Sequence, residues 1–136
     1  RRLTGRVQKL WKICAENGLP SWADICGVDF GSDWDFCFAV DLALSQDRPY
    51  FIFMGDRLAR LSELYLSGDQ RWDVTPLDQV AAKMDETALS KKPVSHNDVI
   101  RIPDGRRIVF RSLLAPLSDN GEDVTHVLGA VNGKGA

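Results

Sequence analysis

Three arginines lie around a tight turn in the segment IPDGRRIVFRSLLAPL, and they are the first candidates for chemistry. Arg106 and Arg107 follow Asp104-Gly105, and Arg111 lies further along the same run. Guanidinium groups hold phosphates and carboxylates well, so the three would suit an anion. In a regular strand, however, side chains alternate, which puts Arg107 and Arg111 on one face and Arg106 on the other. We therefore expect Arg107 and Arg111 to belong to an outer interaction surface, where Asp35 or Asp41 could pair with them.

Carboxylates form the second candidate group. Asp33, Asp35 and Asp41 alternate with apolar residues in a strand predicted from Trp34 to Leu44. Sharing one face, they could crowd enough to raise a pKa for acid–base work. A solvated face, or ion pairs with the basic N-terminal helix, is the interpretation we prefer. The sequence contains no glycine-rich phosphate loop, His-Glu metal motif or nucleophile elbow.

The cysteines and histidines are better explained by structure than by chemistry. Cys14, Cys26 and Cys37 are far apart in sequence, whereas a zinc knuckle or a redox motif needs a close pair. We expect all three to be buried apolar residues, and their odd number without a signal peptide favours a reducing, cytoplasmic compartment. His96 and His126 are expected to be structural rather than ligands.

Composition limits the possible partners. The chain has 136 residues, enough for one domain with a core of its own. Its 17 basic and 19 acidic side chains give a net charge of -2, which argues against nucleic-acid binding. No apolar run approaches the roughly 20 residues that cross a bilayer, so we expect no direct membrane insertion. Because the chain opens at Arg1 without a methionine, we expect a domain from a longer protein.

The first predicted element is an amphipathic helix that ends before Gly18 and Pro20. Its apolar stripe recurs at three- and four-residue spacing and comprises Leu3, Val7, Leu10, Trp11 and Cys14. We divide the chain into a flanking helix at 1–20, a main domain at 21–132 and a flexible tail at 133–136.

The main domain is predicted to be mixed α and β. A hairpin is expected from the strands Trp34–Leu44 and Tyr50–Met54. Two helices should follow, a short one with Leu58, Leu61, Leu64 and Tyr65 and a longer one capped by Thr75. The longer helix should bury Leu77, Val80, Ala81, Met84, Ala88 and Leu89. Three strands complete the domain, at Val94–Ile102, Arg107–Ala115 and Val124–Val131, with turns at 103–105 and 118–121.

This order of elements resembles that of a PAS domain, a sensory and interaction module of bacterial signalling. The resemblance covers the whole chain and is carried by the hairpin DFCFAVDLAL and PYFIFMGD, the two helical segments, and the ending IRIPDGRRIVFRSLLAPLSDNGEDVTHVLGAV. The opening NGLPSWADI is similar to a divergent alphaproteobacterial PAS subgroup. No single motif carries the resemblance, which depends on the order of elements.

The resemblance implies an α+β fold. Its five-stranded antiparallel sheet should have the order second, first, fifth, fourth, third, with the helices on one face. The last two strands are apolar on both sides, so the sheet needs a second cover. The N-terminal helix can supply it, within one chain or exchanged with another copy. Homodimerisation is therefore expected, and the interface candidates are Leu3, Val7, Leu10, Trp11, Cys14, Val109 and Leu113.

As function, the resemblance implies a non-enzymatic sensory or regulatory domain that binds a small ligand, other signalling proteins or an output domain. Candidate pocket-lining residues are Phe36, Phe38, Phe53, Met84, Phe110 and His126. The expected cofactor is none or an unknown small molecule. A flavin photoadduct is disfavoured because no cysteine lies in an Asn-Cys-Arg-like helix start, and haem is disfavoured because residues 76–92 contain no histidine.

Two other interpretations remain open. The aromatic residues could fill the interior completely and leave a ligand-free scaffolding domain. Alternatively, a cystatin-like or cone-shaped α+β enzyme would place His126 and Asp41 inside a cavity. Such an enzyme usually collects its helices before a long run of strands, whereas here two strands precede the main helix, which favours the PAS interpretation.

Overall fold

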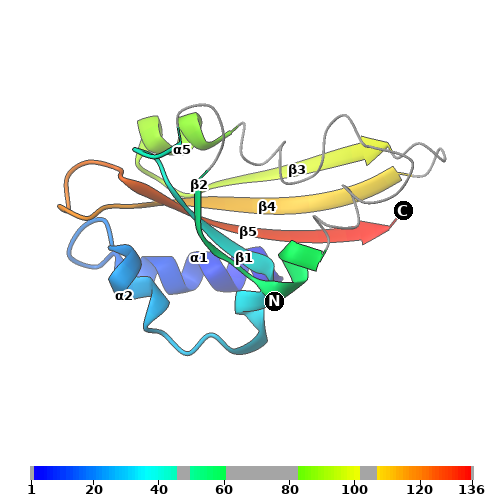
Figure 1. Cartoon of the computed structure of the whole chain (residues 1–136), viewed down its shortest axis with the longest axis horizontal. Coiled ribbons are helices and arrows are strands. Elements are labelled where there is room, and N and C mark those ends of the chain that lie inside the picture. Colours follow the sequence, from blue (N-terminus) through cyan, green and yellow to red (C-terminus); the bar gives the residue numbers. More distant parts are fainter. Residues whose placement is uncertain (1, 46–49, 61–82, 102–106, 136) are drawn as a thin grey trace.

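A five-stranded antiparallel sheet forms the centre of the molecule (Figure 1). The computed structural model describes residues 2–45, 50–60, 83–101 and 107–135. The strands are β1 (Cys37–Asp41), β2 (Tyr50–Met54), β3 (Val94–Arg101), β4 (Arg107–Leu117) and β5 (His126–Gly135). Their spatial order is β2-β1-β5-β4-β3. The predicted α+β fold and strand order are confirmed.

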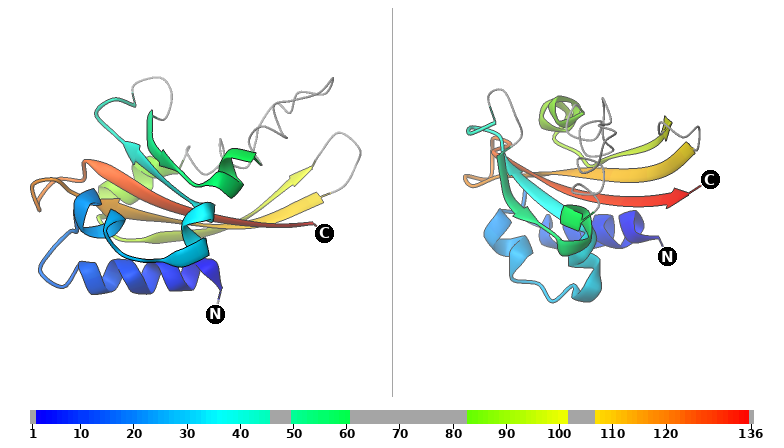
Figure 2. Two further views of the ribbon diagram at one scale, coloured as in Figure 1. Left: turned by 60° about the horizontal axis from the view of Figure 1, so that its bottom comes forward. Right: turned by 45° about the vertical axis from the view of Figure 1, so that its right-hand side comes forward.

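Helices cover both faces of this sheet. One face carries α1 (Leu3–Cys14), with α2 (Trp22–Cys26) and the 3₁₀ helix η1 (Gly31–Phe36) beside it, while α5 (Met84–Ser90) lies over the other (Figures 1 and 2). Residues 56–60 are also helical. Several predicted features lie outside the described residues, namely Leu61, Leu64 and Tyr65, the Thr75 cap, Leu77, Val80 and Ala81, the turn at 103–105, and Arg106.

The α1 helix packs on its own sheet. Its residues Leu3, Val7 and Trp11 are buried, as the amphipathic pattern predicts. They belong to a cluster that we call the α1-side core, which comprises Leu3, Val7, Trp11, Ile25, Cys37, Leu113, Ala115, Leu117, Leu128 and Ala130. The second cover of the sheet is therefore supplied within one chain.

A second cluster lies on the opposite face, and we call it the α5-side core. It comprises Phe38, Val40, Leu58, Met84, Phe110, Leu114, Val127 and Val131. Neighbouring residues of β4 enter different clusters, because Leu113 faces α1 and Leu114 faces α5, and both are fully buried. The ring of Phe38 covers Gly129 so closely that a Cβ there would lie 2.1 Å from the ring.

The first strand is shorter than predicted. Trp34 and Phe36 were expected on the same face as Phe38, but they lie in η1 and pack on the α1 side. The chain enters this turn through Gly31, whose φ of 60° favours glycine. Consequently Asp33 and Asp35 are not strand residues, and the prediction that they share a strand face with Asp41 is wrong.

A β-bulge distorts the hairpin between β1 and β2. Ala39 pairs with Phe53 and Val40 pairs with Phe51, so Ile52 is the extra residue on β2. The bulge turns Phe53 towards the α1 side, while Phe51 packs on the α5 side. Two aromatic residues with the same strand parity therefore serve different cores.

Two further differences concern the second half of the chain. Leu89 was predicted to be buried but is 86% exposed, because the buried face of α5 is formed by Met84 and Thr87. Strand β5 continues to Gly135, past the expected start of a flexible tail, because it pairs with the long β4 as far as Ile108.

Candidate functional site

Among the residues that the structure describes, three buried polar atoms on the α5 side of the sheet have no hydrogen-bond partner. They are Oγ1 of Thr87 in α5, Oγ of Ser112 in β4 and Nε2 of His96 in β3. Thr87 and Ser112 are fully buried, and His96 lies directly opposite Ser112 in the sheet. The nearest carboxylate oxygen recorded for His96 Nε2 is that of Glu86, at 3.6 Å, which is too long for a hydrogen bond.

Apolar residues lie on the same elements and the same face of the sheet as this polar trio. Phe38, Met84 and Phe110 were predicted to line a pocket, and the structure brings all three into the α5-side core. Met84 and Thr87 are the two buried residues of α5, and Phe110 and Ser112 share one face of β4. The sequence interpretation missed the polar trio itself. The feature of the sequence that could have revealed it is Ser112, a polar residue on the apolar inner face of a strand.

Unpaired buried polar groups are unfavourable, at about 1–3 kcal/mol each, and native proteins usually give them a partner. A hydroxyl both donates and accepts, and a neutral imidazole offers one donor and one acceptor. An apolar interior with a few converging polar groups is the usual chemistry of a small-molecule site. Thr87, Ser112 and His96 are therefore the candidate polar groups on the α5 side of the sheet.

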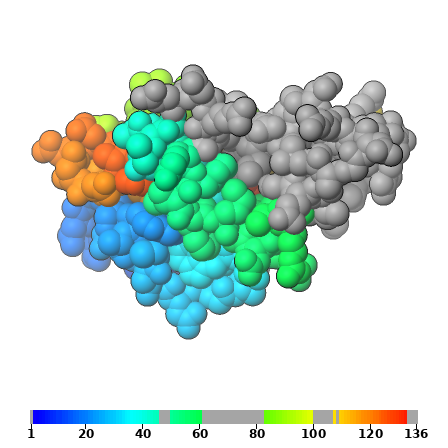
Figure 3. Space-filling model, viewed as in Figure 1, coloured from blue at the N-terminus to red at the C-terminus, as the bar shows by residue number. Residues whose placement is uncertain are grey.

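The other predicted pocket residues lie elsewhere. Phe53 lines an open pocket of about 480 Å³ on the α1 side, formed by Trp22, Cys26, Trp34, Asp35, Phe53, Met54, Gly55 and Asp56. Figure 3 shows α2 and η1, in blue to cyan, meeting the green surface of β2 and residues 56–60. We call this the outer aromatic pocket. Phe36, two residues after Trp34, packs against the α1-side core.

Trp34 packs edge to face against two other rings of the outer aromatic pocket. The Trp34 ring is nearly perpendicular to those of Trp22 and Phe53, with interplanar angles of 86° and 80°. The Trp34 indole N–H donates to the Val28 carbonyl oxygen at 3.1 Å. This hydrogen bond and the ring contacts fix the walls of the pocket before any ligand binds.

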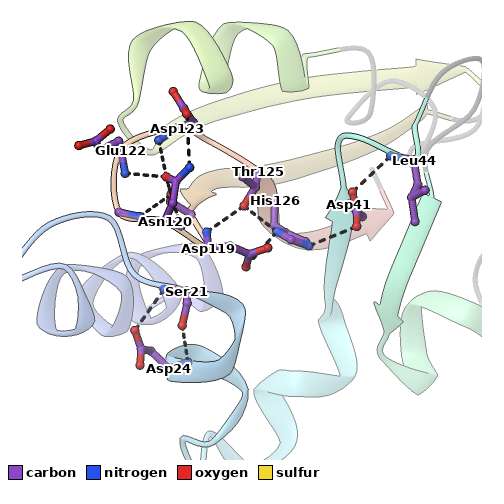
Figure 4. Close-up of polar contacts among 12 residues, drawn as sticks. Ser21, Asp24, Asp41, Leu44, Asp119, Asn120, Glu122, Asp123, Thr125 and His126 are labelled. Carbon is purple, nitrogen blue, oxygen red and sulfur yellow. Dashed lines mark hydrogen bonds and ion pairs between the residues drawn. The ribbon is translucent and has the colours of Figure 1, made fainter.

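The sixth predicted residue, His126, lies at the start of β5 between two carboxylates (Figure 4). Its Nε2 is 3.5 Å from Asp41 Oδ2, and its Nδ1 is 3.7 Å from Asp119 Oδ1. The hydroxyl of Thr125 lies 2.9 Å from Nδ1. These contacts link the start of β5 to β1 and to the β4–β5 turn. His126 belongs neither to the polar trio nor to the outer aromatic pocket.

Arg111 lies in a basic groove beside α1. The groove has a volume of about 530 Å³ and is lined by Arg2, Thr4, Gly5, Gln8, Lys9, Lys12 and Arg111. The register puts Arg107 and Arg111 on the same face as Leu113, as expected for an outer surface. In the part of the chain that the structure describes, no ion pair joins either arginine to Asp35 or Asp41.

One expected ion pair does form between the basic helix and an acidic residue. Nε and an Nη atom of Arg6 donate to the two oxygens of Asp33 at 2.7 and 2.8 Å. These hydrogen bonds hold the pKa of Asp33 below its ordinary value, against the smaller opposing effect of burial. They also raise the pKa of Arg6. The pair fixes η1 to α1.

The cysteines differ in exposure. Cys37 is fully buried in the α1-side core, and burial raises the pKa of its thiol to about 12. Burial also raises the pKa of the half-buried Cys14. Cys26 was predicted to be buried but is exposed at the outer aromatic pocket. Ile25 is the buried residue of this five-residue helix, and Cys26 is its last residue.

Most of the dimer candidates are used inside one chain. Leu3, Val7, Trp11 and Leu113 are in the α1-side core, and Leu10 and Cys14 are half-buried. Val109 is 38% exposed and pairs with Val99, which is 53% exposed. In Figure 2 the sheet extends past the N-terminal end of α1. Val99 and Val109 form an uncovered apolar pair on the α1 face, which we call the valine pair.

Among residues 2–45, 50–60, 83–101 and 107–135, no helix is both long and apolar enough to cross a membrane. The same residues contain no group of three or more histidine, cysteine, aspartate or glutamate side chains placed to hold a metal ion.

Comparison with known proteins gives similarity at the level of the fold. No protein-family model and no curated protein sequence matches the chain. Among solved structures, the LOV domain of a blue-light activated histidine kinase from Erythrobacter litoralis is 14% identical, with a TM-score of 0.47, covering 74% of this chain and 95% of that one. The LOV protein of Rhodobacter sphaeroides is 9% identical, with a TM-score of 0.47, covering 95% and 66%. The light-state Aureochrome1 LOV structure is 15% identical, with a TM-score of 0.46, covering 72% and 80%. The fold assignment rests on the strand order of the sheet itself.

Proposed function

We propose that this chain is a PAS-type sensory or regulatory domain of bacterial signal transduction. It is non-enzymatic and cytoplasmic, and it acts by binding a small ligand, by protein–protein interaction, or by both. Homodimerisation is part of the proposal. Haem and flavin are not part of the proposal, because the sequence lacks the Asn-Cys-Arg-like helix start and the histidine in residues 76–92 that such domains use.

The observation that carries the proposal is the polar trio in the α5-side core. Thr87, Ser112 and His96 offer hydrogen bonds that no described residue of the chain takes up. Met84 and Phe110, on the same helix and strand as Thr87 and Ser112, supply apolar contact area. A small molecule with a polar end and an apolar body suits this combination.

The fold also supplies a route from this site to the other face. In β4, Ser112 and Leu114 face α5, whereas Leu113 faces α1. A displacement of β4 by a ligand therefore changes the packing of α1. The α1 helix is fixed to the same strand by a hydrogen bond from Trp11 Nε1 to the Pro116 carbonyl oxygen, 2.7 Å long.

The ligand part is tested by denaturing the purified protein and recording the mass and absorption spectrum of any released compound. A compound that is released from the wild type and lost from a Ser112→Val variant supports the polar trio as its site. If the Ser112→Val variant still releases the same compound, the polar trio is not its binding site. A clean blank favours a ligand-free scaffold.

For the dimer we propose the valine pair and the adjoining flank of α1 as the interface. Val99 and Val109 keep apolar area exposed, whereas Leu3, Val7 and Trp11 are committed to the core. Charged substitutions at Trp11 would therefore unfold the chain rather than separate copies, and the interface must be tested at Val109. An exchange of α1 between copies would preserve the same core contacts and remains the alternative form of the dimer.

The enzyme alternative has one observation in its favour, namely the approach of His126 to Asp41. Both side chains, however, lie outside the polar trio and the outer aromatic pocket. Two strands also precede α5 in the chain. The sensory interpretation accounts for more of the described side chains.

A further inference from the structure

The described lining of the outer aromatic pocket combines aromatic rings with carboxylates. None of its eight described residues is basic, and two of them, Asp35 and Asp56, carry carboxylates. Over the described residues, neither carboxylate has a recorded hydrogen-bond or ion-pair partner. Asp33, in the same turn as Asp35, is neutralised by Arg6. Arg57 and Arg60 are nearby in sequence, but both are exposed and neither lines the pocket.

The aromatic walls favour the same sign of charge. Trp22, Trp34 and Phe53 lie with their ring centroids 5.5–6.0 Å apart. The faces of aromatic rings attract cations, tryptophan most strongly. The rings touch one another, so a ligand lies alongside them rather than between them. An anion at this place would meet two carboxylates and the negative faces of the rings.

Backbone contacts make the floor of the pocket rigid. Gly55 donates its N–H to the Cys37 carbonyl oxygen at 2.8 Å. A Cβ at Gly55 would lie 2.2 Å from the Trp34 carbonyl oxygen and 2.4 Å from that of Asp35. Only glycine permits this approach between η1 and the end of β2. The carboxylate-bearing turn and the aromatic strand are thereby held together.

We propose that the outer aromatic pocket binds a small organic cation, namely an ammonium or guanidinium group on an apolar or aromatic body. The apolar body contacts Trp22, Trp34 and Phe53, and the cationic end lies towards Asp35 and Asp56. The volume of about 480 Å³ is within the range of small-molecule sites. This site is separate from the polar trio, so the proposal does not depend on a ligand in the α5-side core.

A matched series of three small probes tests the sign of the charge. Phenethylammonium, 2-phenylethanol and phenylacetate share an aromatic body and are cationic, neutral and anionic. Each is titrated into the full chain while the indole N–H signals of Trp22 and Trp34 are followed by NMR, with the buried Trp11 as internal reference. We expect phenethylammonium to bind at least about fivefold more tightly than the alcohol, and phenylacetate to bind most weakly.

Charge removal at the pocket provides the second arm. The double variant Asp35→Asn/Asp56→Asn should weaken phenethylammonium at least about fivefold and leave 2-phenylethanol unchanged. Glu16→Gln removes an exposed carboxylate in the turn after α1 and should change neither affinity. Phenethylammonium should also slow the alkylation of Cys26, which lines the pocket, in the wild type but not in the double variant.

Several results would overturn the proposal. One is an affinity for 2-phenylethanol or phenylacetate equal to that for phenethylammonium. Another is the absence of any shift of the Trp22 and Trp34 signals up to about 10 mM probe. A third is an unchanged affinity for phenethylammonium in the double variant. Tighter binding of a lysine-containing tripeptide than of phenethylammonium would also overturn it, because the site would then recognise peptides. None of these results bears on a compound released from the α5-side core.

Discussion

The indole N–H of Trp11 donates a 2.7 Å hydrogen bond to the carbonyl oxygen of Pro116, 105 residues later in the chain. The bond is buried, and it joins the first helix to the end of β4. Trp11 thus contributes both apolar area to the α1-side core and a polar contact that fixes the position of α1 on the sheet.

Replacing Trp11 by phenylalanine should lower the free energy of unfolding by about 1–3 kcal/mol, because the buried Pro116 carbonyl oxygen loses its donor. Urea denaturation followed by circular dichroism measures the change. Ile13→Ala, on the same helix at a side chain that is 64% exposed, should change stability by less than about 0.5 kcal/mol. Equal effects of the two substitutions would contradict the described packing of α1.

The Arg6–Asp33 pair predicts a specific pH dependence of stability. The pKa of Asp33 is lower in the folded chain than its ordinary value of 3.8, so the pair stabilises the fold above that value and loses this contribution as the pH falls through the folded pKa. Asp33→Asn should therefore be less stable than the wild type at pH 7, and the difference should shrink as the pH falls below 3.8.

Urea midpoints of both proteins from pH 2.5 to pH 7 measure this difference. Asp29→Asn is a carboxylate control in the same segment, and its difference from the wild type should not follow the Asp33 profile. A constant difference between Asp33→Asn and the wild type down to pH 2.5 would show that Asp33 acts through packing rather than charge.

The unpaired hydroxyl of Thr87 makes an unusual prediction, namely that removing a buried polar group stabilises the ligand-free chain. Thr87→Val keeps the shape of the side chain and removes the unsatisfied oxygen. The free energy of unfolding should rise by about 1 kcal/mol.

The control for this prediction is Thr125→Val, because the Thr125 hydroxyl accepts a hydrogen bond from the Asp119 N–H at 3.0 Å. That variant should be destabilised by about 1 kcal/mol. Loss of stability in Thr87→Val as large as in Thr125→Val would mean that the Thr87 hydroxyl has a partner, and the polar trio would no longer mark a site.

The valine pair predicts the effect of charge on self-association. Val109→Asp should convert the proposed dimer to a monomer in light scattering, with the dissociation constant rising at least about 100-fold, because an unpaired carboxylate would be buried between copies. Leu89→Asp, on the opposite face of the sheet and 86% exposed, should leave the mass unchanged. A Val109→Asp protein that keeps the wild-type dimer mass excludes this interface.

How much the sequence reveals depends on the range of the interactions. The stripe of Leu3, Val7 and Trp11 and the two-sided apolar character of β4 are local patterns, and they correctly predict α1, the sheet and its two covers. The turn that holds Trp34 does not follow from alternation, because a strand and a 3₁₀ turn both accept short runs of alternating apolar and polar residues. Its conformation is decided by Gly31 and by contact with Trp22, which lies 12 residues before Trp34 in the chain.

The candidate sites were harder to predict than the fold. The bulge at Ile52 sends Phe51 and Phe53 to opposite faces, and no local pattern announces it, so the predicted pocket residues were divided between two cores. The polar trio arises because register places His96 opposite Ser112 and because α5 turns Thr87, not Leu89, towards the sheet. Register and helix rotation are set by tertiary packing, which one sequence does not specify residue by residue.

The central claim is that this domain binds a small molecule, another copy of itself, or both. Native mass spectrometry of the purified full chain tests both parts in one measurement. The account predicts a dimer mass, or a mass that exceeds the bare chain by a bound compound lost on denaturation. Bare monomer at every protein concentration from about 1 to 100 μM would contradict it.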